Sequence, residues 1–254
     1  MRCGLLSGNS YDYREFEILN IALMMKTIGL LGGMSWESTA TYYKWINEMI
    51  RRRLGGLHSA KLLLYSFDFE EIARLQTNGD WQQAAEMLSD AALKLENAGA
   101  DALMICTNTM HLVYARVADA VKIPVIHIAD PTAAAIQQLE LKKVGMLATR
   151  FTMEQDFYIR RFREQHQIEV IVPGHDDRQL VHDIIYDELC KGIINDSSRH
   201  QYIHVIQNLI DSGAGAIVLG CTEIGMLINQ TDVAVPVFDT TYLHAQAAVK
   251  FCLS

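Results

Sequence analysis

The chain has 254 residues, half of them hydrophobic, and a formal net charge of −8 without a long basic run. This composition allows one large or two medium folded domains with a substantial core, and the acidic balance argues against a nucleic-acid partner. The five cysteines form no Cys-x-x-Cys pair, which indicates reduced thiols in a cytoplasmic protein rather than a disulfide framework or a zinc ribbon.

The first 24 residues lack both the long apolar centre of a signal peptide and the roughly 20 apolar residues of a membrane span. Regular patterning begins only at Met25, so a start at Met24 or Met25 could give a complete domain. We therefore expect residues 1–24 to be a leader outside the core, either poorly ordered or packed peripherally as a short helix over residues 13–24. We expect no membrane partner.

From Lys26 onward, short apolar runs alternate with longer amphipathic stretches. This alternation predicts a parallel sheet with helices on both faces, because parallel strands need crossover connections. The expected strands of this first pass are residues 28–31, 62–67, 102–106 and 125–128. The expected helices are residues 36–54, 81–98 and a segment after Thr109.

A second pass of the same kind begins at Lys143. Its expected strands are residues 144–148, 169–172, 216–219 and 236–239, and its expected helices are residues 152–165, 179–191 and 197–212. The two passes can be overlaid, since Gly29 precedes Thr107 by 78 positions and Gly145 precedes Cys221 by 76. We therefore predict an α/β fold of two pseudo-symmetric lobes, residues 25–126 with 236–254 and residues 127–235.

Ligands of open α/β sheets bind beyond the carboxyl ends of the strands, and two equivalent lobes would place these ends face to face. The predicted cleft is lined by residues 32–35, 107–109, 149–152 and 221–223. Nucleotide, P-loop and HExxH motifs are absent from the sequence, and no lysine announces a pyridoxal-phosphate site. These features predict a small polar substrate held without cofactor or metal.

The residues of this cleft suit a carboxylate ligand and acid–base chemistry. The glycine pair Gly32-Gly33 would let the backbone approach a ligand closely. Donors for a carboxylate are available from polar side chains at Asn108, Thr109, Thr149, Thr152 and Thr222. Cys221 supplies a thiol, whose ordinary pKa of ~8.5 a helix start can lower.

Four motifs in order resemble the aspartate/glutamate racemase family, within the Asp/Glu/hydantoin racemase superfamily. They are IGLLGGMS at 28–35, TNTMH at 107–111, TRFTM at 149–153 and GCTE at 220–223. The similarity extends from Lys26 nearly to the C-terminus. It implies a two-lobed, commonly dimeric enzyme that racemises an amino acid without pyridoxal phosphate, using two bases on opposite faces of the α-carbon, one of them Cys221.

The sequence departs from the family pattern at the other base. The usual motif is Cys-Asn-Thr-x-His, and alignment on Asn108, Thr109 and His111 puts Thr107 at the cysteine position. Cys106 lies one residue earlier and would face the core, since neighbouring side chains of a strand point to opposite faces. We favour Thr107 over Cys106 as the first-lobe group. A hydroxyl is the weaker base, so the rates from the two enantiomers should differ, or a water should relay the proton.

Further substrate-binding residues follow from the resemblance. Gln76, and less so Asp68, flank the exit of the second strand, where related enzymes hold the distal carboxylate. Met34 lies in the first cleft loop. Lys191 is near the position of a lysine that binds the side-chain carboxylate in related racemases, with Cys190 as the competing residue at that register.

Two more polar residues have both a catalytic and a structural interpretation. His111 could tune Thr107, or it could cap or pack at the start of a helix. Glu223 could orient Cys221 or influence its protonation, or it could simply complement a helix dipole.

The leading functional hypothesis is a cytoplasmic, homodimeric racemase of aspartate or glutamate. A broad-specificity amino-acid racemase is the next alternative, because no arginine marks a distal-carboxylate site at the second-strand exit. A single-cysteine enzyme of the same superfamily, such as a maleate isomerase or malonate decarboxylase, is a third. A non-catalytic amino-acid-binding protein is the fourth, because the first cysteine is missing.

Overall fold

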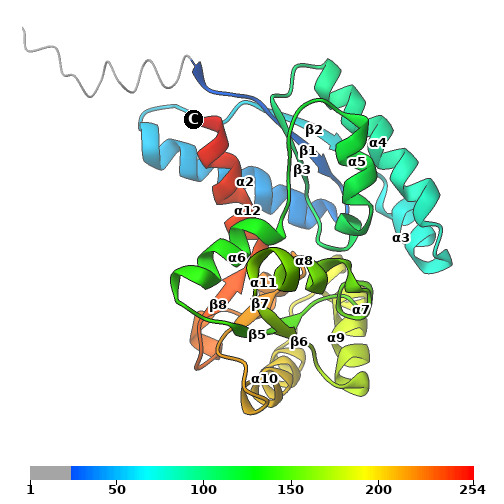
Figure 1. The fold of residues 1–254 in the computed structure, drawn as a ribbon, viewed down its shortest axis with the longest axis vertical. Coiled ribbons are helices and arrows are strands. Elements are labelled where there is room, and N and C mark those ends of the chain that lie inside the picture. Colours follow the sequence, from blue (N-terminus) through cyan, green and yellow to red (C-terminus); the bar gives the residue numbers. More distant parts are fainter. Residues whose placement is uncertain (1–23) are drawn as a thin grey trace, which may run out of the picture.

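The computed structural model describes residues 24–254, so the leader predicted over residues 1–24 lies outside the described residues except for Met24. The chain forms two lobes, each built on its own sheet (Figure 1). Within the described part of the chain, no helix has the length and apolar character needed to cross a bilayer.

The first sheet has the order β2-β1-β3-β4 and the second has the order β6-β5-β7-β8, and every neighbouring pair is parallel. The predicted α/β class and the two similar lobes are therefore confirmed. The strands of the first sheet are β1 (Ile28–Gly32), β2 (Leu62–Ser66), β3 (Ala102–Ile105) and β4 (Val125–Ile126). Those of the second are β5 (Lys143–Leu147), β6 (Glu169–Ile171), β7 (Ile217–Leu219) and β8 (Val237–Asp239).

The strand register makes the internal repeat exact at the level of single residues. Gly29 of β1 pairs with Leu103, and Gly145 of β5 pairs with Ile217. Each glycine leaves room for its partner, since a Cβ on Gly29 would lie 2.6 Å from Leu103 Cδ2 and one on Gly145 would lie 3.0 Å from Ile217 Cδ1. Thr107 lies four residues after Leu103, and Cys221 lies four residues after Ile217. Thr107 and Cys221 therefore occupy equivalent positions in the two repeats.

The first lobe agrees with the predicted helices and adds one. Its helices are α2 (Trp36–Leu54), α3 (Phe69–Asn78), α4 (Trp81–Asn97), the 3-10 helix η1 (Thr109–Val113) and α5 (Tyr114–Ala120). Helix α3 was not predicted; Asp68 caps its start by accepting the Glu70 N–H, and Gly79 ends it with a φ of 71°. The cap explains Asp68, whose side chain satisfies a helix N-terminus rather than a substrate.

In the second lobe, the predicted helix over residues 152–165 is two helices, because Gln155 has an extended backbone that interrupts the hydrogen-bond ladder. The lobe contains α7 (Arg150–Glu154), α8 (Asp156–His166), α9 (His175–Asp187), η2 (Leu189–Lys191), α10 (Asp196–Asp211), α11 (Ile224–Leu227) and η3 (Gln230–Asp232). The helix predicted over residues 179–191 thus begins earlier, at His175, and closes as a separate 3-10 turn.

The helix after the last strand of each sheet crosses to the other lobe. Helix α6 (Ala129–Gln138) follows β4 but buries Ala133 and Ile136 in the core of the second lobe. Helix α12 (Thr240–Cys252) follows β8 but buries Ala248 and Val249 in the core of the first. The two helices contact each other at the junction of the lobes, in the middle of the view in Figure 1.

This exchange corrects the predicted lobe boundary at residue 236. Strand β8 pairs with β7 and belongs to the second sheet, so residues 236–239 are part of the second lobe. The return to the first lobe begins at Thr240, where α12 starts. The prediction was wrong because β8 has only three residues, and so short an apolar run does not indicate which sheet it joins.

Candidate active site

A small, partly enclosed pocket lies between the lobes, at the carboxyl ends of strands from both sheets. Its lining combines small polar, aromatic and apolar side chains from the two lobes. The lining residues are Met34, Phe69, Gln76, Thr107, Asn108, Thr109, Thr149, Ile185, Tyr186, Cys190, Gly220, Cys221 and Glu223.

Thr107 and Cys221 line this pocket from opposite lobes, each two residues beyond the end of its strand. Cys106 instead lies in the core between the first sheet, α2 and α12, and burial raises the pKa of its thiol well above the ordinary value. The alternation of side chains along β3 therefore separates the two candidates, with the hydroxyl in the pocket and the thiol in the core.

Cys221 is hydrogen-bonded to the carboxylate of Glu223. Its Sγ donates to Glu223 Oε2 at 3.0 Å, Thr222 Oγ1 donates to the same oxygen at 2.6 Å, and Ser35 Oγ donates to Oε1 at 2.7 Å. Ser35 belongs to the first lobe, so this carboxylate also links the lobes. Thr222 was predicted to bind substrate, but its hydroxyl donates its hydrogen to Glu223 instead.

Burial, reinforced by the charge of Glu223, raises the pKa of the Cys221 thiol well above its ordinary value. This reverses the expected lowering by a helix start. Helix α11 has only four residues, and its dipole is too small to offset desolvation and a carboxylate at hydrogen-bond distance. The thiol therefore holds its proton and faces a group that can accept it.

His111 fixes the backbone beside Thr107. Its Nε2 accepts the N–H of Ile128 at 3.1 Å, so this nitrogen carries no proton. The hydrogen must sit on Nδ1, which donates to the carbonyl oxygen of Thr107 at 2.8 Å. Burial lowers the pKa of His111 to about 3, which keeps the ring neutral. The histidine thus positions the Thr107 backbone, and its contact is not with the hydroxyl.

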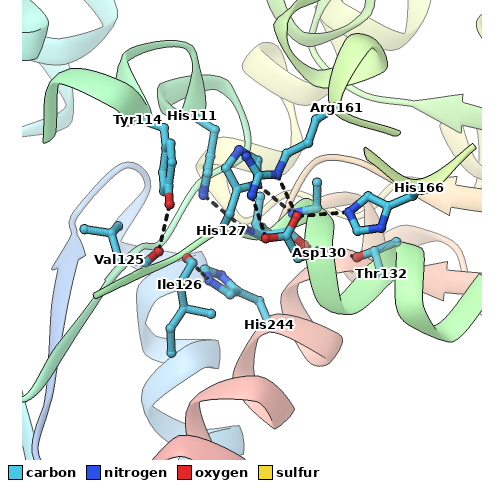
Figure 2. A network of polar contacts seen from close by, with 12 residues as sticks. His111, Tyr114, Val125, Ile126, His127, Asp130, Thr132, Arg161, His166 and His244 are labelled. Atoms are coloured by element: carbon cyan, nitrogen blue, oxygen red, sulfur yellow. Dashed lines mark hydrogen bonds and ion pairs between the residues drawn. The ribbon is translucent and has the colours of Figure 1, made fainter. Parts of the chain in front are cut away.

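Two other buried histidines surround His111 at the junction of the lobes (Figure 2). Its ring centroid lies 4.4 Å from that of His127 and 6.0 Å from that of His244. His244 of α12 donates from Nε2 to the carbonyl of Ile126 at 2.8 Å and accepts the Tyr42 hydroxyl at Nδ1 at 2.9 Å. All three rings are held neutral, because burial lowers each pKa.

Next to these rings, an ion pair joins α6 to α8. Arg161 donates to both oxygens of Asp130, at 2.6 and 2.7 Å, and His166 Nε2 lies 3.2 Å from Oδ1 (Figure 2). Burial alone would raise the pKa of Asp130, but the guanidinium holds it below the ordinary value. The pair stabilises α6 in its exchanged position and lies outside the pocket lining.

Asn108 offers a free acceptor to a ligand. Its Nδ2 donates to Thr240 Oγ1 at 3.0 Å, and that hydroxyl donates to the Leu219 carbonyl at 2.8 Å. This chain fixes which end of the amide faces Thr240. Oδ1 is buried and has no hydrogen-bond partner among the described residues, and Asn108 lines the pocket. A donor on a bound ligand, such as an ammonium group, would satisfy it.

Three threonine hydroxyls form a triangle at one wall. Thr109 Oγ1 lies 2.9 Å from Thr149 Oγ1 and 3.3 Å from Thr152 Oγ1, and the last two are 3.3 Å apart. Thr149 also caps α7 by accepting the Thr152 N–H. Thr109 and Thr149 line the pocket from opposite lobes, and Thr152 supports them from behind.

Gln76 reaches the pocket from the unpredicted helix α3. Its Oε1 accepts the hydroxyl of Tyr186 from the other lobe at 3.0 Å, and its Nε2 lies 3.1 Å from the sulfur of Met110. Tyr186 stacks against Phe69, with ring centroids 6.4 Å apart. The sequence analysis missed Phe69, Ile185 and Tyr186, because no motif marks residues that meet only through the packing of two lobes.

Other predicted residues divide between pocket and surface. Met34 lines the pocket, and so does Cys190. Lys191 lies outside it, with its side chain 60% exposed and its Nζ 3.5 Å from Asp187. Gly33 was expected to let a ligand approach, but its missing Cβ makes room for the backbone of Phe67, 2.4 Å from where that atom would be.

The ionisable groups of the pocket are sparse. Of the described residues that line it, Glu223 is the single carboxylate, and none is a lysine, arginine or histidine. No cluster of three or more His, Cys, Asp or Glu side chains suited to a metal ion occurs over residues 24–254. The lining thus includes one hydrogen-bonded thiol–carboxylate pair, Cys221 with Glu223, and the Thr107 hydroxyl from the other lobe, which are groups suited to proton transfer to and from a small ligand.

The known proteins that resemble this chain are described as racemases. A family model described as Asp/Glu/Hydantoin racemase matches residues 31–248. The broad specificity amino-acid racemase RacX of Bacillus subtilis is 25% identical over 234 residues, which cover 89% of this chain and 98% of RacX.

Solved structures are similar over the same region. The crystal structure of a candidate Asp/Glu racemase from Yersinia pestis is 53% identical, with a TM-score of 0.84, and the match covers 91% of this chain and 100% of the other. PH1733, an aspartate racemase homologue from Pyrococcus horikoshii, is 34% identical with a TM-score of 0.79 and the same coverage. A glutamate racemase from Francisella tularensis shares the fold at 18% identity and a TM-score of 0.65, over 87% of this chain and 79% of that one.

Proposed function

Because the chain belongs to the Asp/Glu/hydantoin racemase family, we propose that it is a cofactor-independent amino-acid racemase whose two proton-transfer groups are Cys221 and Thr107. One observation carries the proposal. The strand registers make these two residues equivalent, and both line the same pocket from opposite lobes. Racemisation needs two groups on opposite faces of one carbon, and a pseudo-symmetric pair meets that need.

The first step uses the hydrogen bond between Cys221 and Glu223. The Cys221–Glu223 pair carries one negative charge at the start. The thiol passes its proton to the carboxylate, and the resulting thiolate then removes the α-proton of the substrate from one face. Ser35 and Thr222 keep the carboxylate oriented. Burial of the pair makes an isolated thiolate costly, so the local acceptor is essential to the proposal.

The second step occurs at the other face. The Thr107 hydroxyl delivers a proton to the planar intermediate and takes one from a water in the same movement, so that no free alkoxide forms. The hydroxide left by that water is neutralised by the proton that Glu223 accepted in the first step, which returns the Cys221–Glu223 pair to one negative charge. His111 holds the backbone of Thr107 in place for this transfer. In the reverse direction the hydroxyl and water must remove a proton, which is the harder task, so the initial rates from the two enantiomers should differ.

The α-amino and α-carboxylate groups of the substrate have complementary partners. Asn108 Oδ1, buried without a partner among the described residues, suits the ammonium group. The hydroxyls of Thr109 and Thr149 suit the carboxylate. The family is named for aspartate and glutamate, whereas RacX has broad specificity. The proposed contacts therefore concern the α-amino and α-carboxylate groups, which all amino acids share.

The test is exchange of the α-proton in heavy water across the common amino acids, followed by NMR. Cys221→Ala should lose ~10²–10⁴-fold in exchange rate, as expected when a positioned acid–base group is removed. Cys252→Ala is a matched control, because that cysteine is buried in the first-lobe core outside the pocket. Binding without exchange of any amino acid by the unmodified protein would instead identify a non-catalytic binding protein.

The proposal also includes a homodimer in the cytoplasm, as the family resemblance implies. The four cysteines of the described region are free, as a reducing compartment would have them. Light scattering after size-exclusion chromatography should give twice the chain mass of 28.6 kDa.

A further inference from the structure

We infer that the pocket disfavours amino acids with an anionic side chain and that Gln76 sets this preference. The inference rests on the proposed racemase function and adds the substrate class to it. It departs from the aspartate and glutamate that the family description names.

The first argument is the charge of the lining. Glu223 is the single ionised side chain among the pocket-lining residues of the described chain, and it is negative. Two cations of the same lobe lie outside this lining: Lys191 is exposed and pairs with Asp187, and Arg150 donates to Gln179 Oε1 at 3.2 Å. A side-chain carboxylate would therefore enter beside another carboxylate with no cation to meet it.

The second argument is the cost of such a charge. The α-carboxylate of any amino acid is balanced by its own ammonium group, but a second carboxylate is not. An unpaired buried charge is unfavourable, and a like charge nearby makes it more so. An amide of the same size avoids this penalty, because it needs hydrogen bonds and no counter-ion.

Gln76 is buried in the pocket wall, with 3% of its surface exposed. Its Oε1 accepts the Tyr186 hydroxyl, and within residues 24–254 its Nε2 has only the sulfur of Met110, a weak acceptor, as its partner. The amide can therefore still donate to a neutral polar side chain. Phe69 and Tyr186 beside it provide an apolar surface for aliphatic groups.

The experiment compares isosteric substrates with the unmodified full-length protein. Rates of α-proton exchange in heavy water are measured for glutamine against glutamate and for asparagine against aspartate, with methionine and leucine as apolar substrates. The kcat/KM for each amide should exceed that for its acid by at least about tenfold, which corresponds to ~1.4 kcal/mol. Equal or faster exchange of the acids would overturn the inference while leaving the racemase function intact.

Two variants at Gln76 test the specificity role. Gln76→Lys should shift the glutamate-to-glutamine ratio of kcat/KM toward glutamate, mainly through KM, because the ammonium supplies the missing counter-ion. Gln76→Met, of similar length and without charge, should not favour glutamate. A ratio unchanged by Gln76→Lys in a protein that still exchanges methionine would refute the role of Gln76. Absence of exchange with every amino acid in the unmodified protein would refute the proposed function itself.

Discussion

At the scale of single residues, the proposed chemistry depends on Thr107 and Cys221, which line the pocket from opposite lobes. The two positions are related by the repeat, but they carry a hydroxyl and a thiol. A thiol with a carboxylate at 3.0 Å has a ready proton acceptor, and a threonine hydroxyl does not reach an ionised state near neutral pH. The pseudo-symmetric pocket is therefore chemically asymmetric.

Exchange of Thr107 tests this asymmetry. Thr107→Ala should sharply reduce turnover, and Thr107→Cys should retain or raise it by restoring a thiol pair. Cys106→Ala should act mainly on stability, because that thiol fills space in the core. Initial rates from the L- and D-substrate, measured for all three variants, check these outcomes. Loss of activity in Cys106→Ala with Thr107→Ala unaffected would transfer the role to Cys106.

Glu223 is the second residue-scale test. Glu223→Gln keeps the size of the side chain but removes the proton acceptor, so exchange should fall by ~10²-fold or more. The residual rate should rise with pH, because the buried thiol must then lose its proton directly to solvent. Ser35→Ala removes one of the three donors to Glu223 and should have a smaller effect. A pH–rate profile of Glu223→Gln that matches the unmodified protein would contradict the shared-proton mechanism.

At the scale of elements, three histidines meet at the junction of the lobes: His111 lies in η1, His127 just before α6, and His244 on α12. Each ring uses one nitrogen as an acceptor: His111 from Ile128 N–H, His127 from Ala129 N–H and His244 from the Tyr42 hydroxyl. Protonation of any ring would therefore break a hydrogen bond as well as bury a charge. Arg161 raises the cost further for His111 and His127.

This cluster predicts a loss of stability in mild acid. Burial lowers the pKa of His111 to about 3 and that of His244 to about 4, and it lowers the pKa of His127 as well. The unfolded chain takes up protons near pH ~6.5, so the stabilisation is complete above that pH and is lost as pH falls below it. Three such groups should reduce the free energy of unfolding by ~4 kcal/mol per pH unit between pH ~6 and the folded-state values.

Urea unfolding at a series of pH values measures this slope. His127→Asn is the matched variant, since its amide oxygen can still accept the Ala129 N–H, and it should reduce the slope by about one third. Protonation of Asp130, whose pKa is lowered beside Arg161, adds to the loss only at more acidic pH. A free energy of unfolding that stays constant between pH 7 and pH 5 would show that these histidines are not buried neutral.

At the scale of the whole molecule, the exchanged helices couple the lobes. Each lobe lacks a complete core without a helix that follows a strand of the other, α6 in one direction and α12 in the other. The pocket between the lobes lies at the same junction, with Gln76 and Tyr186 hydrogen-bonded across it. The relative position of Thr107 and Cys221, the two groups of the proposed mechanism, is therefore set by the same packing that completes both cores.

We expect the two lobes to unfold together. Differential scanning calorimetry should give one transition whose calorimetric and van't Hoff enthalpies agree. Val249→Ala, in α12, should lower the transition of the entire molecule by removing buried methyl groups worth ~1 kcal/mol or more, without splitting it. Two separate transitions would show that the lobes are stable independently.

The sequence by itself determined the α/β class, the two passes and the strand-end residues, because apolar runs, glycines and polar strand ends are local patterns. It also placed Thr107 rather than Cys106 in the cleft, since two adjacent residues of a strand point to opposite faces, and both Thr107 and Cys221 line the pocket. Helix α3, the position of β8 and the exchange of α6 and α12 depended on which surfaces pack together, and no local pattern records that.

The tertiary structure alone decided the environment of the site. Cys221 was expected to have a lowered pKa from its place at a helix start, but burial and Glu223 raise it. Lys191 lies outside the pocket, whereas Cys190, the competing residue, lines it together with Tyr186. Desolvation and contact between lobes are properties of the assembled molecule, so only the packed structure could define the electrostatics that we propose select the substrate.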